Sequence, residues 1–257
     1  MLRNINSLTG HRIQATDGEI GKVDEFYFDD QTWDIRYMVV DTGNWLAGRK
    51  VLISPAALRA PDWKAKTFPV ALTRERVYNS PDIDTDAAVS RRHELELHKH
   101  YAWPIYWGDG FYAGSMSGGT LFPPVAGEEE EQDADAERAL AETHLQGTRG
   151  VTGYRLHAVD GPIGHVVDFI IDDEQWIIRY LVAATGAWLP GRKVLISPNW
   201  IESVDWETSE VFVDLSREAV KNSPVLDASK PVHVDYEGKL YDHYGRSRKD
   251  YRPCYQS

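Results

Sequence analysis

Adjacent carboxylates occur twice in the chain, at Asp29-Asp30 and at Asp172-Asp173. Acidic oxygens suit a divalent cation, but calcium needs several of them from one loop, and the residues after each pair lack that spacing. Asp also tolerates unusual backbone angles and bonds its own backbone, which makes it common in turns. We therefore interpret both pairs as turns at the ends of strands.

Histidine pairs could hold a transition metal, and His98 and His100 are the nearest candidates. On a helix, side chains two residues apart do not share a face, which argues against joint ligation. Ser54 and Ser197 each precede a proline, and no histidine or acid stands at a catalytic spacing from them. Ser followed by Pro is typical of a helix start instead. We predict no catalytic residues, no metal site and no cofactor.

Two basic spots interrupt this acidic sequence. The block Gly-Arg-Lys-Val-Leu-Ile-Ser-Pro occurs twice and contains Arg49-Lys50 and Arg192-Lys193. A basic spot could receive an acidic partner through charge complementarity. The solvated end of a strand is the favoured interpretation of these residues, and the acidic-partner interpretation stays open.

Tryptophans and tyrosines form the second group of candidate interaction residues. Trp45 and Trp188 each follow a Thr-Gly pair in an expected loop. Either residue could anchor an interface or plug the end of a barrel. Tyr101, Trp103 and Trp107 belong to an aromatic stretch that has no equal near the C-terminus, so we expect this stretch to lie against the other half or another subunit.

Charge and composition exclude several classes of protein. The 257 residues have a formal net charge of −12, which disfavours nucleic acid as a partner because phosphate binding needs clustered Lys and Arg. The one cysteine, Cys254, cannot form an internal disulfide or a multi-cysteine metal site. Neither a signal-peptide pattern nor a long apolar span is present, so we expect a cytoplasmic location without direct membrane insertion.

These candidates lie within an internal repeat. Residues 9–84 match residues 152–227 at a constant offset of 143 positions, without a gap. A repeat of this length is a duplicated domain, because solenoid units have periods of about 20 to 50 residues. The two copies must therefore position their side chains with the same fold.

Each copy has the pattern of short strands joined by tight turns. Asp17-Gly18 and its counterpart lie between apolar stretches and predict a two-residue hairpin turn. In the next strand Val23 and Phe26 are three residues apart, which predicts a β-bulge of the kind that bends a strand in a small barrel. The later segments alternate apolar and polar residues, as half-buried strands do.

A short helical arm follows the strands in each copy. Leu97 and Tyr101 lie four residues apart, as do Leu240 and Tyr244, so each pair can form one apolar helix face. The fold class is therefore all-β, with two small closed barrels that each carry a C-terminal helical arm.

The expected domains are 1–107 for the first barrel and its arm and 151–257 for the second. Residues 108–150 between them are rich in Gly, Ser and Pro and then in Glu and Asp. Such a composition buries too little apolar area to offset the entropy of ordering the chain. We predict a flexible acidic linker there.

The order of these motifs (Asp-Gly, Gly-x-Val, Asp-Asp, Ile-Arg-Tyr, Lys-Val-Leu-Ile-Ser-Pro) resembles the PRC-barrel domain in both copies. The chain is similar to the cytoplasmic part of the photosynthetic reaction-centre H subunit and to stand-alone, two-copy bacterial PRC-barrel proteins. The resemblance implies six-stranded barrels used for protein–protein contact and assembly. It supplies no catalytic residues.

We expect a non-enzymatic adaptor module whose two barrels pair within the chain and bind an unidentified protein partner; homo-oligomerisation stays open. Tandem modules gain avidity through effective concentration, which favours this hypothesis. The alternative is a small-molecule- or ion-binding regulator, linked to stress responses or to photosynthetic reaction-centre assembly. Small barrels fill their interiors with side chains, which counts against the alternative.

Overall fold

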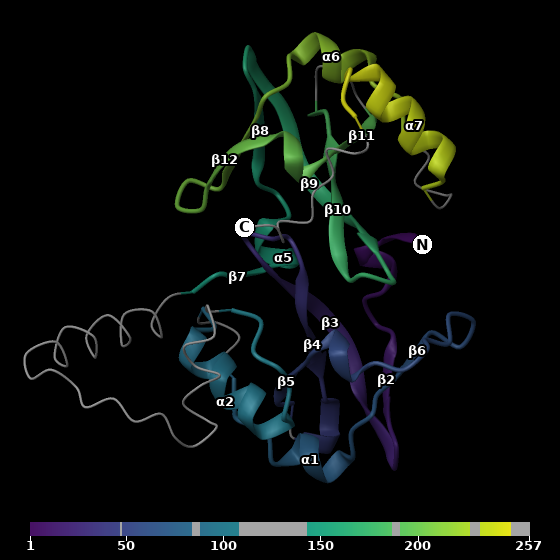
Figure 1. Cartoon of the computed structure of the whole chain (residues 1–257), viewed down its shortest axis with the longest axis vertical. Helices are drawn as coiled ribbons and strands as arrows, with labels where there is room; N and C mark the ends of the chain where they lie inside the picture. Colours follow the sequence, from purple (N-terminus) through teal and green to yellow (C-terminus); the bar gives the residue numbers. More distant parts are fainter. Residues whose placement is uncertain (47, 84–87, 108–142, 187–190, 227–231, 248–257) are drawn as a thin grey trace, which may run out of the picture.

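The computed structural model describes residues 1–46, 48–83, 88–107, 143–186, 191–226 and 232–247. The protein is mostly β, with two sheets that belong to the two halves of the chain. The halves are stacked along the long axis of the molecule (Figure 1). In the described part of the chain, no helix has the length and apolar character needed to cross a membrane.

The first half contains the strands β2 (Arg12–Ala15), β3 (Gly18–Asp29), β4 (Ile35–Asp41), β5 (Lys50–Ile53) and β6 (Thr67–Pro69). Its helices are α1 (Arg74–Tyr78), α2 (Arg91–Tyr101) and the 3-10 helices η1 (Ile5–Ser7), η2 (Gly43–Leu46) and η3 (Pro55–Ala57). Helix α2 is the predicted arm, and it buries Leu97 and Tyr101 on one face.

The second half repeats this order with β8 (Arg155–Ala158), β9 (Gly161–Asp172), β10 (Ile177–Ala184), β11 (Lys193–Ile196), β12 (Ile201–Asp205) and β13 (Glu210–Val213). Its helices are α5 (Thr148–Val151), α6 (Arg217–Asn222), α7 (Val234–His243) and the 3-10 helix η5 (Pro198–Trp200). The arms α2 and α7 lie on opposite sides of the molecule (Figure 1).

The strand ladders do not form the closed rings that the sequence led us to expect. Their orders are β5-β4-β3-β2-β6 and β11-β10-β9-β8-β13-β12, and neither path returns to its start within the described residues. The open seam follows β5, where Ser54 begins η3 with Pro55 at its first position. Proline lacks an N–H and cannot extend a ladder, so the chain turns a corner there.

The predicted β-bulge is confirmed in both halves. The pairing of β3 with β4 shifts register between Val23 and Glu25, and that of β9 with β10 shifts at the corresponding place, between Val182 and Ala183. The extra residue in each long strand lets the sheet bend.

The first hairpin turn lies one residue earlier than predicted. Ala15 pairs directly with Gly18, so Thr16 and Asp17 form the turn rather than Asp17 and Gly18. The Asp17 carboxylate accepts a hydrogen bond of 2.8 Å from the backbone N–H of Arg74, at the start of α1. A long-range contact thus fixes this turn, which a local pattern cannot reveal.

Strand β12 was not predicted. It pairs with β13 in the second half, whereas residues 58 and 62 of the first half form only isolated bridges to Val70 and Thr67. Its sequence, Ile-Glu-Ser-Val-Asp, has too few apolar residues to give a strand signal.

The Ser-Pro positions are helix caps, as predicted. The Ser54 hydroxyl accepts from the N–H of Ala56, and the Ser197 hydroxyl accepts from that of Asn199. Both helices are short 3-10 turns rather than α-helices.

The halves exchange short strands. β1 (Leu2–Asn4), at the start of the chain, pairs with β9 of the second half. β7 (Leu145–Gly147), just before the second half, pairs with β3 of the first. The two registers agree after the offset of 143, with Leu2 opposite Asp172 and Leu145 opposite Asp29. The exchange is therefore a pseudo-twofold arrangement.

The predicted linker is corrected at its C-terminal end. Residues 145–150 belong to β7 and to α5, because the exchanged strand gains a backbone partner in the other half. The Gly-, Ser- and Pro-rich part and the acidic part, up to residue 142, lie outside the described residues.

Candidate functional site

Acidic side chains anchor each exchanged strand. Asp168 accepts from the backbone N–H of Asn6 and from the Asn4 amide, both at 3.2 Å. Its counterpart Glu25 accepts from the backbone N–H of Arg149 at 3.3 Å. Burial raises the pKa of Asp168 and of Glu25 above their usual values.

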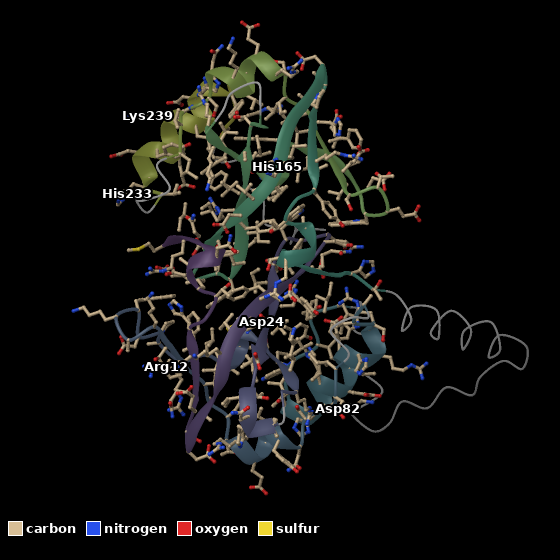
Figure 2. All side chains as sticks on the ribbon, turned by 180° about the vertical axis from the view of Figure 1, so that it is seen from behind. Arg12, Asp24, Asp82, His165, His233 and Lys239 are labelled. Carbon is tan, nitrogen blue, oxygen red and sulfur yellow. The ribbon has the colours of Figure 1, made fainter. Side chains whose placement is uncertain are left out.

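Asp24 adds an ion pair across the junction. Its carboxylate lies 2.6 Å from the Arg149 guanidinium and 2.9 Å from the Lys50 ammonium. The hydrogen bond from Arg149 is the main reason why the pKa of Asp24 lies below its usual value. Asp24 sits near the middle of the molecule, at the level where the halves meet (Figure 2).

Two tryptophans reach across the same junction. The N–H of Ile35 donates to the carbonyl of Trp176 at 2.7 Å, and the N–H of Ile178 donates to that of Trp33 at 2.9 Å. Both tryptophans have positive φ angles, 63° for Trp33 and 56° for Trp176. The Trp176 ring packs against Phe68 of the first half, with centroids 5.9 Å apart. The tip at Trp176 thus inserts its ring into the first half, and the tip at Trp33 bonds the second half through its backbone carbonyl.

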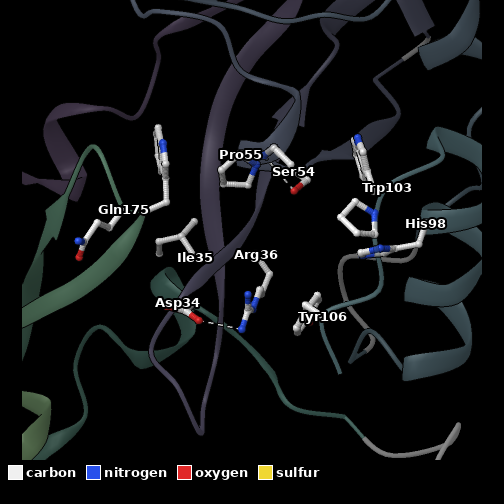
Figure 3. Close-up of a pocket in the computed structure, with 12 residues that line it drawn as sticks. Asp34, Ile35, Arg36, Ser54, Pro55, His98, Trp103, Tyr106 and Gln175 are labelled. Carbon is white, nitrogen blue, oxygen red and sulfur yellow. Dashed lines mark hydrogen bonds and ion pairs between the residues drawn. The ribbon is translucent and has the colours of Figure 1, made fainter. Parts of the chain in front are cut away.

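A pocket of about 490 Å³ lies beside Trp176 at this junction (Figure 3). In the close-up, Gln175 is on one side, Trp103, His98 and Tyr106 are on the other, and Pro55 lies between them. Gln175 and Trp176 come from the second half and the rest of the lining from the first: Asp34, Ile35, Arg36, Ser54, Pro55, Ala56, His98, Trp103, Pro104 and Tyr106.

An ion pair forms the floor of this pocket. The Arg36 guanidinium lies 2.8 Å from the Asp34 carboxylate, drawn as a dashed line in Figure 3, and 3.7 Å from the centroid of the Tyr106 ring. Burial raises the pKa of Asp34, although Arg36 opposes the shift. The two charges largely compensate each other, so the floor is polar without a strong net charge.

A buried polar cluster lies behind the pocket. Glu94 is fully buried and accepts hydrogen bonds from the Tyr37 hydroxyl at 3.1 Å, from Arg91 at 2.8 Å and from the Tyr106 hydroxyl. The Tyr37 oxygen also lies 2.8 Å from Nε2 of His98.

Burial shifts the titration of this cluster. It raises the pKa of Glu94, although the hydrogen bonds from Tyr106, Arg91 and Tyr37 oppose the shift. It lowers the pKa of His98, so the imidazole is held in its neutral form. A neutral His98 and a satisfied Glu94 are suited to fixing the arm α2 against β4.

The second half lacks this cluster. Tyr241 and Val234 occupy the positions of His98 and Arg91. Glu237, which corresponds to Glu94, still accepts from the Tyr180 hydroxyl at 2.7 Å. The pocket and its polar backing are therefore features of the first half.

Tyr101 and Trp103, both predicted interaction residues, stack on each other with centroids 4.2 Å apart. In the second half Trp200 packs on Tyr244, which corresponds to Tyr101, at 4.7 Å. Ala57 stands at the position of Trp200, so the indole on the arm tyrosine comes from a different element in each half. Tyr101 is buried, and Trp103 keeps partial exposure at the pocket.

The predicted basic residues bond mainly within their own halves. Arg49 donates to the carbonyls of Tyr78, at 3.0 Å, and of Ser80, and Arg192 donates to the carbonyl of Ser223. These bonds satisfy backbone carbonyls at or just after the C-terminal ends of α1 and α6, which helix ends leave without partners. Of the adjacent lysines, Lys50 pairs with Asp24, and Lys193 is exposed.

The remaining predicted residues lie apart from the pocket or outside the described part. Trp45 is half-buried beneath Arg74, whose guanidinium lies 4.5 Å from its ring centroid. Trp107 packs against His98 at 5.1 Å, behind the pocket. Trp188 lies outside the described residues.

Sequence reasoning missed the two tip tryptophans and the Asp34–Arg36 pair. A signal existed, because Trp33 and Trp176 occupy the same position in both copies, directly after turn residues. A large apolar residue at a hairpin tip needs a surface to cover it. Asp34 gave no such signal, since Ile177 stands in its place in the second copy.

A second pocket, of about 540 Å³, occupies the twofold-related side of the junction. Trp33, Pro198 and Trp206 line it, together with Asp30 and His144, whose carboxylate oxygen and Nδ1 are 3.4 Å apart. Trp33 is only 9% exposed, so this pocket offers one half-buried indole, that of Trp206, where the first pocket offers those of Trp103 and Trp176.

The comparisons with known proteins fit this architecture. The profile of the PRC-barrel domain family matches residues 2–72, which span β1 to the residues just after β6. No curated protein matches the chain significantly. PRC-barrel domains are small β-barrel modules, often found in protein-interaction contexts and generally non-enzymatic. The chain therefore contains a PRC-barrel domain at residues 2–72.

Proposed function

We propose that the chain is a non-enzymatic adaptor, in which two PRC-type barrels pair and together present one docking site for a protein partner. The observation that carries the proposal is the pocket of about 490 Å³, because its lining comes from both halves. Neither half alone could form it. Trp103 and Tyr106 supply the aromatic surface that interface centres favour.

The same proposal gives the domain organisation. Residues 1–107 and 151–257 are the two barrel units, and each pairs with a short strand, β7 or β1, that leads into the other unit. We further propose that side chains close each rolled sheet across the seam after β5 or β11. The exchange fixes the relative placement of the halves, and this fixed placement keeps the docking site formed.

A small-molecule-binding regulator is the second candidate function. Ligand pockets typically measure about 300 to 1,000 Å³ and are lined by aromatic side chains with a few polar groups. The pocket at Trp176 meets this description, with Asp34 and His98 as the polar groups.

Affinity capture from the source cells with the full chain as bait tests the adaptor function. The matched variants are Ala56→Arg and Asn199→Arg, at exposed and equivalent positions of the two junction pockets. A partner that docks at the first pocket should be captured by the wild type and by Asn199→Arg but lost with Ala56→Arg. A small molecule that raises the melting temperature of the wild type, without any captured protein, would favour the regulator instead.

A further inference from the structure

The chemistry of the first junction pocket narrows the class of partner. Its lining is largely apolar. Trp103 and Trp176 are half-buried and come from different halves, and Pro55, Pro104 and Tyr106 complete the surface. Grooves lined by aromatic rings bind proline-rich segments, because the preformed polyproline II helix loses little entropy on binding.

The charges in the pocket favour an uncharged occupant. Asp34 and Arg36 face each other at 2.8 Å, and Tyr106 lies against the guanidinium. A cation placed there would meet Arg36, and an anion would meet Asp34. A charged partner would therefore face a like charge that offsets its attraction.

Several hydrogen-bond donors at the pocket suit a peptide that offers backbone carbonyls as acceptors. Among the described residues, no hydrogen bond is formed by the indole N–H of Trp103 or of Trp176. The Ser54 hydroxyl accepts from Ala56, which leaves its own proton to donate, and the exposed Gln175 amide can also donate. Proline has no N–H, and a polyproline II helix leaves its carbonyls open to outside donors.

From these three features we infer that the pocket binds a proline-rich segment of a partner protein in the polyproline II conformation. This inference rests on the proposed adaptor function and names the chemistry of its partner. The pyrrolidine rings would pack between Trp103 and Trp176, and the indole, Ser54 and Gln175 donors would reach the peptide carbonyls. The twofold-related pocket is a poorer site, since Trp33 is only 9% exposed and Trp206 is its one half-buried indole.

Calorimetric titration of the full chain with a synthetic decaproline peptide tests the inference, with a Gly-Ser peptide of equal length as the control probe. We expect saturable binding of decaproline at one site per chain and none of the control peptide. Ala56→Arg should weaken binding about tenfold or more, because the new side chain fills the pocket. Asn199→Arg should leave the affinity unchanged within about twofold, since a distant surface change adds no interaction.

Three results would overturn the inference: no saturable binding to the wild type, binding that survives Ala56→Arg, or an equal loss with both variants. Thermal unfolding of each variant distinguishes a loss of peptide binding from a loss of the folded structure. If decaproline fails but a captured protein still depends on Ala56, the adaptor function stands and the proline chemistry is wrong. If decaproline binds at the pocket and no protein is captured, the adaptor function fails instead.

Discussion

The first half contains buried carboxylates whose charge is stabilised by individual neighbouring side chains. Glu94 is fully buried but receives hydrogen bonds from Tyr37, Arg91 and Tyr106, so the desolvation of its carboxylate is compensated. The carboxylate of Asp29, which is also buried, lies 3.5 Å from the other terminal nitrogen of the Arg91 guanidinium. The arm α2 is thus fastened by a polar cluster in addition to the apolar contacts that both arms share.

Replacing Glu94 by Gln should lower the free energy of unfolding by about 1 to 3 kcal/mol. The amide NH₂ of Gln would face one of the buried donors that now bond the carboxylate, and neither group would then have an acceptor. The matched control is Glu237→Gln, at the equivalent and less buried position, which should cost less than about 1 kcal/mol. Urea denaturation of the full chain measures both. Equal losses in the two variants would contradict a special role for the first-half cluster.

His98 should make stability depend on pH. Burial keeps its folded pKa below the usual value of 6.5, so the folded state disfavours a proton that the unfolded state accepts. Its contribution to stability is present above that usual value and is lost as the pH falls through the folded pKa. His98→Tyr, which introduces the residue found at 241, should remove this part of the decline, whereas His165→Gln at an exposed position should not.

The experiment is a series of denaturation curves on the three proteins between about pH 7 and pH 5, around the usual pKa of histidine. Glu94 and Asp34 titrate in the opposite sense, since burial raises their pKa values and stabilisation appears as they take up protons. The difference between wild type and His98→Tyr isolates the histidine. Parallel curves would show that His98 does not contribute.

At the scale of elements, the exchanged strands depend on buried acids. Asp168→Ala should lower stability by about 1 to 3 kcal/mol, because the N–H of Asn6 loses its acceptor. It should also speed amide hydrogen exchange in residues 2–6. Asp160→Ala, which removes the cap on Arg217 far from the junction, is the control. A variant Asp168→Ala with wild-type protection of residues 2–6 would contradict the anchoring role.

Close backbone contact makes two glycines essential to the long strands. A Cβ at Gly164 would lie 1.9 Å from the carbonyl oxygen of Ala184, and one at Gly21 would lie 2.1 Å from that of Asp41. Either residue changed to Ala should cost at least about 2 kcal/mol, since the paired strands must move apart. Gly150→Ala has open space and should be neutral or stabilising by up to about 1 kcal/mol. Thermal melts decide between these outcomes.

The sequence predicted elements whose signal is local. Strand β4, the bulge at Val23 and the Ser54 cap follow from alternation, spacing and capping chemistry within a few residues. The three-residue strands β1 and β7 are too short for any period, and they exist only because a distant strand accepts them. Long-range pairing leaves no local pattern, which is why the exchange was missed.

In the candidate site, too, some residues could be predicted from the sequence and others could not. The aromatic stretch Tyr101–Trp107 was visible as an asymmetry between the copies, and Trp103 does reach the pocket. The tip residue Trp176 and the pair Asp34–Arg36 reach the pocket only because the halves are packed together. The sequence shows which side chains these are, but it does not show that they line one pocket.

At the scale of the whole molecule, the two exchanged strands β1 and β7 fit their receiving halves through different side-chain contacts. A Cβ at Gly147 would lie 2.9 Å from the Glu25 carboxylate and 3.2 Å from the Tyr27 ring. Asn4 occupies the equivalent place in β1, where Asp168 bonds its amide. Each exchanged strand is therefore fitted to its own recipient, and the first half should prefer the second half over another copy of itself.

Trp176 should be a main source of the pairing energy. Trp176→Ala should destabilise the full chain by about 1 to 3 kcal/mol, because the ring is half-buried and packs against Phe26 and Phe68 of the first half. Trp45→Ala, in η2 and away from the junction, should cost clearly less. Denaturant unfolding of both variants measures the difference, and equal costs would argue against the inserted tip as the centre of the interface.

The central claim is that the two halves complete each other, and cutting the chain between them tests it most directly. A protease site placed within residues 108–142 allows the intact protein to be cleaved after it has folded. Size-exclusion chromatography with light scattering should then show one 1:1 complex of the two parts at micromolar concentration, because stable interfaces of ordinary size persist there. Two separate, folded monomers after cleavage would contradict the account.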